Sequence, residues 1–398
     1  MASEVCVVGV GMVPFVKPGK SDPYDVMGEK ATRAALTDAG VDYSSVQEAY
    51  VGYVYGDSTA GQKALYRVGQ TGIPIINVNN NCATGSSALY LARRAILSGA
   101  ADCVLALGFE QMGSGAVEMH WPDRPTPLEE FDATTTRAQG WDAEAPFAAQ
   151  YFGGAGLSHM ELYGTAPETF AKISVKARRH AAANPYAMFR EPLTEEQVLA
   201  SPHIFGPLTR LQCCPPACGA AAAIVCSSDF AKSAGLDSRV VIKAQSLVTD
   251  TSTTFDGKDM RALAGYDMAR MAANEVYEAS GVDPRDIPVV ELHDCFTTNE
   301  LVTYEGLGLT DEGTAEAFVL NGDNTYGGRV VTNPSGGLLS KGHPLGATGL
   351  AQCAELVWQL RGQAGGRQVE GASIALAHNV GLGGACVVTL YEHAGDQR

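Results

Sequence analysis

The residue types best suited to chemistry gather in four runs, three of which are rich in asparagine or glycine. The first run, residues 79–87, sets Cys82 where an apolar, strand-like stretch turns into a stretch rich in Ala and Leu. A thiol at a helix start faces unpaired backbone N–H groups and the positive end of the helix dipole, which favour thiolate over thiol. Cys82 is therefore a candidate nucleophile, and the alternative is a small buried apolar cysteine.

The other three runs carry acid–base groups and exposed amides. Residues 291–296 place His293 and Cys295 two positions apart, on one side of the chain if it is an extended strand. His343 lies in the glycine-dense run 333–349, which leads into a helix start. The glycines of 378–384 follow a strand and suit either an oxyanion hole or a plain tight turn. Together with a cysteine nucleophile, these groups are the ones that acyl transfer needs.

A metal site is the alternative for His293 and Cys295. No other nearby cysteine or histidine completes a zinc set, and the cysteines of 213–218 lack the usual partner histidines, so we predict no metal. The net charge of −16 argues against a nucleic-acid partner. Ten cysteines at irregular spacing in 398 residues are typical of reduced intracellular thiols. The sequence has no apolar run of membrane-spanning length and no basic, then apolar, leader, so we expect no membrane insertion.

Basic residues concentrate between positions 172 and 190. A phosphate-bearing ligand could dock there, and the alternative is a solvated helix face. The candidate phosphate contacts in this stretch are Lys172, Lys176, Arg178 and Arg179.

An internal repeat supplies the elements that must position these residues. Strand-like residues 5–10 have a counterpart at 240–245, and the stretches 39–42 and 280–283 each end a helix and lead into a strand, at 50–55 and 291–296. The Ala-Thr-Gly that follows Cys82 recurs after Gly346, and both copies open helices. The repeat predicts a duplicated α/β unit with mixed or mostly parallel sheets and helices on both faces.

The two copies do not account for residues of about 114 to 212. We predict that this segment is an insertion in the first half and that it shapes a ligand site. The expected organisation is a first half over 1–113 and 213–238, an inserted loop domain over 114–212, and a second half over 239–398.

The four runs resemble the motifs of the thiolase superfamily, and the likeness extends over nearly the whole chain. More narrowly, the chain is similar to sterol-carrier-protein-type thiolases. It has His293-Asp-Cys295-Phe where most thiolases have Asn-Glu-Ala-Phe, and Asn379-Val-Gly381 where most have Cys-x-Gly. The resemblance implies a five-layered α-β-α-β-α thiolase fold of two similar halves, with an inserted loop domain that holds coenzyme A.

The resemblance also implies a role for each site residue. Cys82 would attack the 3-keto carbon of a 3-oxoacyl-CoA, with His343 helping to hold the thiol deprotonated. Backbone N–H groups of Cys82 and Gly381 would meet the oxyanion. His293 and His343 would donate hydrogen bonds to the enolate oxygen while Cys295 protonates C2. A second coenzyme A would then take the acyl group from Cys82.

Several expectations about partners follow from the same resemblance. Acyl-CoA and CoA are substrates, no cofactor is tightly bound, and the protein is a homodimer or homotetramer. The sequence ends soon after the last strand and lacks a Ser-Lys-Leu ending, so we expect no fused lipid-transfer domain and a cytoplasmic location. A separate lipid-transfer or lipid-metabolism protein is the expected kind of protein partner. The alternatives are a thiolase-like retro-aldolase acting on steroid side-chain CoA esters and a non-catalytic acyl-CoA- or lipid-binding protein.

Overall fold

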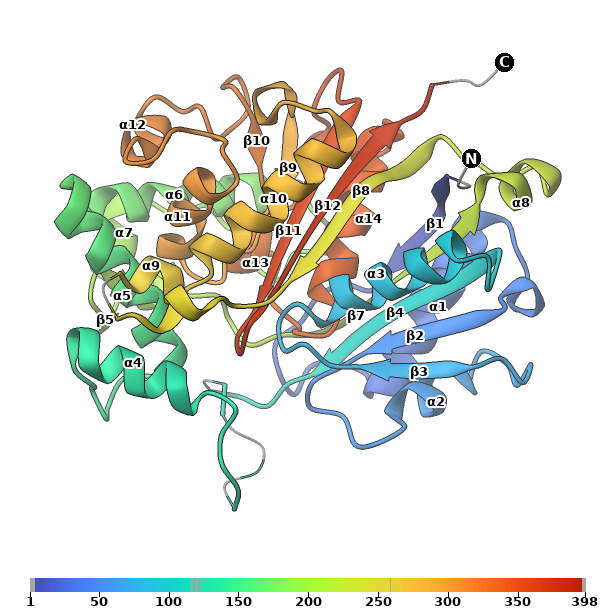
Figure 1. Ribbon diagram of the computed structural model, residues 1–398, viewed down its shortest axis with the longest axis horizontal. Helices are drawn as coiled ribbons and strands as arrows, with labels where there is room; N and C mark the ends of the chain where they lie inside the picture. The colour runs from blue at the N-terminus through green and yellow to red at the C-terminus, as the bar shows by residue number, and fades with distance from the viewer. Residues whose placement is uncertain (1–3, 116, 119–120, 122, 258, 396–398) are drawn as a thin grey trace.

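The chain folds around ten strands that join into one large mixed sheet (Figure 1). The computed structural model describes residues 4–115, 117–118, 121, 123–257 and 259–395. The first half contributes β1 (Val5–Met12), β2 (Glu48–Gly52), β3 (Ile75–Val78), β4 (Cys103–Gln111) and β7 (Cys218–Ser227). The second half contributes β8 (Val240–Val248), β9 (Val289–Glu291), β10 (Val331–Thr332), β11 (Ile374–Gly381) and β12 (Ala385–His393).

The strand order confirms the internal repeat. The first half runs β3-β2-β4-β7-β1 and the second β10-β9-β11-β12-β8, so each strand has a counterpart at the same position. The pairing directions also match, with parallel pairs at the β3 and β10 ends and antiparallel pairs at β7 and β12. The halves meet where Cys6 of β1 pairs with Val241 of β8.

The two halves of the sheet form separate strand layers on either side of two central helices. With an outer helix layer on each half, the stack has five layers, as the thiolase resemblance implies. Alternate strand residues face opposite sides, and one set from both halves packs on the central helices α3 (Thr84–Leu97) and α14 (Thr348–Leu360). The other set packs on outer helices: α1 (Tyr24–Ala39) on the first half, α10 (Tyr266–Ser280) and α11 (Thr297–Gly306) on the second. The layers approach closely at glycines, since a Cβ on Gly108 would lie 2.1 Å from the Gly346 carbonyl oxygen.

The segment between β4 and β7 adds no strand to the large sheet within the residues described. It forms α4 (Glu129–Gln139), α5 (Phe147–Tyr163), α6 (Pro167–Ala181), α7 (Glu195–Leu199) and a small hairpin of β5 (His203–Phe205) and β6 (Leu208–Thr209). This arrangement fits an insertion, and the domain boundaries themselves stay a prediction. The remaining short helices are α2 (Ala60–Leu65), α8 (Ser228–Ser233), α9 (Met260–Leu263), α12 (Ala315–Leu320) and α13 (Gly337–Ser340).

One predicted strand is shorter than expected. The strand predicted over 291–296 ends at Glu291, and residues 292–296 form an irregular link to α11. An Asp294 N–H bond to the Leu292 carbonyl, 3.1 Å long, turns the chain there. His293 and Cys295 therefore lie on a connecting segment rather than on a strand face. In the described part of the chain, no helix has the length and apolar character that a membrane span requires.

Candidate active site

Cys82 lies in a tight turn between β3 and α3. Asn81 adopts φ +50°, a left-handed conformation that asparagine tolerates better than most residues. Thr84 Oγ1 accepts the Asn80 N–H at 2.9 Å and donates to the Asn81 carbonyl at 2.6 Å, which closes the turn. Cys82 is 8% exposed. The run of three asparagines thus turns the chain sharply enough to present the thiol just before the helix.

His343 is held with one ring nitrogen engaged and the other free. Its Nδ1 lies 2.7 Å from Thr348 Oγ1, and the Thr348 hydroxyl donates to the Pro344 carbonyl at 3.0 Å. The hydroxyl oxygen therefore accepts, so Nδ1 carries the proton and Nε2 carries a lone pair. Nε2 is buried and has no hydrogen-bond partner among the described residues. An imidazole held in this way can accept a proton from a neighbouring thiol.

His293 lies beside His343, although the two come from separate segments. The two rings meet edge to face with centroids 5.0 Å apart. The Asn379 side-chain oxygen lies 2.9 Å from His293 Nδ1, and the Asn379 amide nitrogen donates to Ser86 Oγ at 3.1 Å. Asn379, which stands out in the sequence only as the residue that replaces the Cys of the Cys-x-Gly motif, thus links the ring to α3, the helix that follows Cys82.

The structure brings three of the predicted catalytic groups together. Cys82 Sγ and one ring nitrogen each of His293 and His343 lie within 4.8 Å of one another. Cys295, 4% exposed, lines the same cavity as Cys82 and His343. One thiol and two imidazoles could also hold a divalent ion such as Zn²⁺, so the expected lack of a metal stays a prediction.

The cavity at Cys82 is apolar and draws on both halves and the insertion. Its volume is about 380 Å³. Its apolar walls include Met112, Ala149, Phe152, Ile204, Phe296 and Leu382. Four residues at or just before the start of α5 line this cavity, namely Pro146, Ala148, Ala149 and Phe152.

Burial keeps the catalytic groups neutral. Desolvation raises the pKa of Cys82 to about 12 and that of Cys295 well above its ordinary range. Desolvation also lowers the pKa of His293 to about 4 and that of His343 well below its ordinary value. Backbone N–H groups at the turn do lower the pKa of Cys82, as the sequence predicts, but burial outweighs them, so the net shift favours the thiol. The thiol must lose its proton as it attacks.

The backbone around Gly381 lies directly against the Cys82 turn. A Cβ on Gly381 would lie 2.1 Å from the Asn80 carbonyl oxygen, so no side chain fits there. The N–H groups of Leu382 and of Cys82 itself act on the Cys82 sulfur and lower its pKa. Leu382 was not predicted as a donor, although it follows Gly381 in the same glycine-rich turn. Donation by Gly381 to an oxyanion stays a prediction.

The predicted phosphate contacts lie elsewhere, on α6. Lys176 is 4% exposed and forms an ion pair with Glu300, and Thr332 Oγ1 lies 2.6 Å from its Nζ. The prediction is therefore wrong for Lys176, because its ammonium group is already paired in the interior. The cation that does line the cavity is Arg210, which is exposed and lies in the insertion.

The other three cations of α6 contact protein groups. Lys172 pairs with Glu195 at 2.7 Å, and Arg179 donates to Thr325 Oγ1 at 2.9 Å. The Arg178 guanidinium lies 4.5 Å from the centroid of the Phe189 ring. Their binding of CoA phosphates stays a prediction, and none of them lines the cavity at Cys82.

A duplicated five-layer fold with a cysteine at a central helix start and two histidines beside it defines a class of acyl-transfer enzymes, and comparisons with known proteins agree. The family model "Thiolase, N-terminal domain" matches residues 5–201, and "Thiolase C-terminal domain-like" matches residues 250–390. The chain therefore belongs to the thiolase family and is an acyltransferase.

Individual relatives cover nearly the whole chain. Sterol carrier protein 2 of Rattus norvegicus is 56% identical over 98% of this chain and 72% of its own length. Acetyl-CoA acetyltransferase of Methanothermobacter thermautotrophicus is 36% identical over 98% of this chain and 99% of its own. These identities carry the family assignment along the full described length.

Solved structures share the fold. Human mitochondrial 3-ketoacyl-CoA thiolase has a TM-score of 0.74 at 20% identity, covering 98% of this chain and 99% of its own. The Ltp2-ChsH2(DUF35) aldolase has a TM-score of 0.81 at 23% identity, covering 99% of both chains. At these low sequence identities, the structural similarity supports the fold assignment alone.

Proposed function

We propose that this thiolase cleaves 3-oxoacyl-CoA with coenzyme A to acyl-CoA plus acetyl-CoA, or propanoyl-CoA from a 2-methyl substrate, through an acyl group carried on Cys82. The observation that carries the proposal is the cluster of Cys82 Sγ with ring nitrogens of His293 and His343 within 4.8 Å. Cys295 opens into the same cavity and supplies a second thiol. Nucleophile, base and acid thus meet at one apolar site.

The first step forms the acyl-enzyme. Cys82 attacks C3 of the substrate while its proton passes to Nε2 of His343, the nitrogen that Thr348 leaves free. N–H groups of Cys82 and Gly381 receive the oxyanion, and one such donor contributes roughly 3 kcal/mol of barrier lowering. The C2–C3 bond then breaks, which leaves the acyl group on Cys82 and an enolate.

The second step protonates the enolate, transfers the acyl group to CoA and restores the starting protonation states. His343, now carrying the Cys82 proton, donates to the enolate oxygen, and His293 is the second polar group beside it. The Cys295 thiol protonates C2 and becomes a thiolate. That thiolate takes the proton of the incoming CoA thiol, the CoA sulfur attacks the acyl group, and His343 returns its proton to Cys82. Protons and sulfurs are then back where they began.

The substrate proposal rests on the cavity. Its walls are apolar and include the small side chains of Ala148 and Ala149, and this composition supports a branched acyl chain as substrate. Arg210 is the cation placed to meet the negative charge of a CoA ester. A panel of 3-oxoacyl-CoA substrates that varies in chain length and 2-methylation tests this proposal by CoA-dependent loss of 3-oxoacyl-CoA absorbance. No turnover of any member would contradict it.

The retro-aldolase alternative is separated by the same assay. A retro-aldolase needs no acyl-enzyme and no second CoA, so its cleavage would persist without added CoA. Cys386→Ala is a suitable control variant, because Cys386 lies in β12, fully buried in the second-half core and away from the cavity. It should keep wild-type thiolysis, whereas Cys82→Ala should lose it.

We further propose a homodimer or homotetramer and a cytoplasmic location. The half-exposed strand β3 ends the sheet on one side, and its free edge suits pairing with a second copy. Light scattering coupled to gel filtration measures the oligomeric state, and a monomer would contradict the first proposal. Fractionation of the source cells tests the second.

A further inference from the structure

Asp294, the residue between His293 and Cys295, binds the segment that carries His343. Asp294 is fully buried, and its carboxylate accepts the Leu338 N–H at 2.7 Å and the Leu339 N–H at 3.4 Å. These N–H groups belong to the first turn of α13. A Cβ on Gly337 would lie 2.0 Å from Asp294 Oδ2, so the carboxylate sits directly against the helix start.

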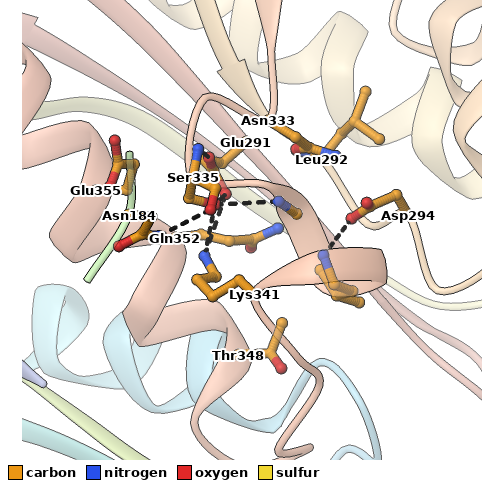
Figure 2. A network of polar contacts seen from close by, with 12 residues as sticks. Asn184, Glu291, Leu292, Asp294, Asn333, Ser335, Lys341, Thr348, Gln352 and Glu355 are labelled. Atoms are coloured by element: carbon orange, nitrogen blue, oxygen red, sulfur yellow. Dashed lines mark hydrogen bonds and ion pairs between the residues drawn. The ribbon is translucent and has the colours of Figure 1, made fainter. Parts of the chain in front are cut away.

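Glu291, three residues earlier, contacts the residues that come before and after the same short helix. It accepts the Ser335 N–H at 3.0 Å and the Ser335 hydroxyl at 2.8 Å, and Lys341 Nζ lies 3.3 Å away (Figure 2). Ser335 precedes α13 and Lys341 follows it. Two carboxylates from one segment therefore hold residues 335–341. Asp294 binds the start of the helix, and Glu291 binds the residues that precede and follow it.

This attachment bears on the catalytic groups because each is close in sequence to an attached residue. His293 and Cys295 flank Asp294, and His343 lies two residues beyond Lys341. A displacement of about 1 Å between reacting groups can cost on the order of 100-fold in rate. Catalysis therefore depends on a fixed distance between the segment that carries His293 and Cys295 and the segment that leads to His343.

We propose that Asp294 is a positioning residue that, by capping α13, fixes His293 and Cys295 relative to His343 for cleavage of the C2–C3 bond. The inference rests on the proposed roles of these three residues. Acylation of Cys82 by a simple acyl-CoA needs Cys82 and His343, because the CoA thiolate is a weak enough base to leave without a proton from Cys295. C–C cleavage also needs His293 and Cys295, because its leaving group is a carbon that must be protonated. Misplacing the two segments must therefore slow cleavage more than acylation.

The experiment compares these two rates in the full chain. Acylation is followed as the mass increase of Cys82 after mixing with acetyl-CoA, and cleavage as CoA-dependent loss of 3-oxoacyl-CoA absorbance. The variants are Asp294→Ala, which removes the cap, and Asp294→Asn, which keeps one acceptor oxygen. The control is Glu355→Gln, which breaks a buried 2.9 Å ion pair with Arg367.

In Asp294→Ala we expect kcat for cleavage to fall about 100-fold, with acylation reduced less than about tenfold and KM within about threefold. Asp294→Asn should lie between, at about tenfold in kcat, since one of the two accepted N–H bonds is kept. Glu355→Gln should lower the thermal midpoint and leave the ratio of the two rates at the wild-type value.

The outcomes separate this inference from the function on which it rests. A wild-type chain that acylates Cys82 but cleaves no 3-oxoacyl-CoA contradicts the proposed function. An equal loss of both rates in Asp294→Ala, or an unchanged ratio in Asp294→Asn, overturns the positioning role alone. Should Asp294→Ala fail to fold, the ratio in Asp294→Asn decides.

Discussion

Glu110 offers a direct test of how burial controls this site. It lies near the end of β4, is 1% exposed, and accepts the N–H groups of Val54, Tyr55 and Gly346, each at 3.0 Å. It thus ties the loop after His343 to the first half. Burial nevertheless raises the pKa of Glu110 from 4.5 to about 7, and its charge in turn raises the pKa of Cys82.

The sign of the pH effect follows from the raised pKa. The folded protein holds the Glu110 proton more tightly than the unfolded chain does, so this group stabilises the fold fully below about pH 4.5. That stabilisation is lost as the pH rises through 7. At about 1.4 kcal/mol per pH unit, the raised pKa corresponds to about 3 kcal/mol of unfolding free energy.

Glu110→Gln removes this dependence, because the amide does not titrate. Urea unfolding measured between pH 4.5 and pH 8 should show the variant gaining about 3 kcal/mol relative to wild type over that range. Alkylation of Cys82 at pH 8 should also be faster in the variant, since the negative charge is gone. Glu161→Gln, at an exposed position on α5, is the control and should follow wild type. A constant difference between Glu110→Gln and wild type at every pH would refute the reasoning.

Three further predictions test other contacts. Lys341→Met leaves Glu291 buried without its cation and should cost about 3–5 kcal/mol of unfolding free energy, and Glu291→Gln added to it should recover part of that loss; a double variant less stable than Lys341→Met would contradict this. Asn379→Asp places a carboxylate beside His293, whose pKa should rise from about 4, and titration of the His293 ring followed by NMR should show a midpoint at higher pH; an unmoved midpoint would count against the contact. Ala149→Phe should fill the cavity and raise KM for long or branched substrates far more than for the shortest, and uniform kinetics across chain lengths would exclude this wall.

The fold could be predicted from the sequence because the sequence contains two copies of the same α/β unit. The Ala-Thr-Gly after Cys82 and after Gly346 opens the two central helices, α3 and α14, in equivalent places. An element predicted in one copy is therefore supported by the equivalent element in the other copy. The glycines concerned are required by contact between layers, since a Cβ on Gly349 would lie 2.1 Å from Ser86 Oγ.

Long-range packing sets the limit of prediction from sequence. Lys176 lies in a basic stretch that looks like a solvated helix face or an anion site, yet its partner Glu300 is 124 positions away. The protonation state of Cys82 is set in the same way, because the N–H groups that lower its pKa come from local turns, whereas the burial that raises it comes from the whole cavity. In the sequence, Asp294 stands out only as the residue between His293 and Cys295, and Asn379 only as the residue in place of the motif cysteine. Their partners on α13 and α3 come into contact only through the fold.

The measurement that tests the central claim most directly is the mass of the Cys82 peptide after mixing with acyl-CoA, in wild type, Cys82→Ala and Cys295→Ala. The account predicts an acyl adduct on Cys82 in wild type and in Cys295→Ala, no adduct in Cys82→Ala, and C–C cleavage in wild type alone. An adduct on Cys295 in wild type, or equal loss of acylation in both variants, would contradict the division of labour between the two thiols.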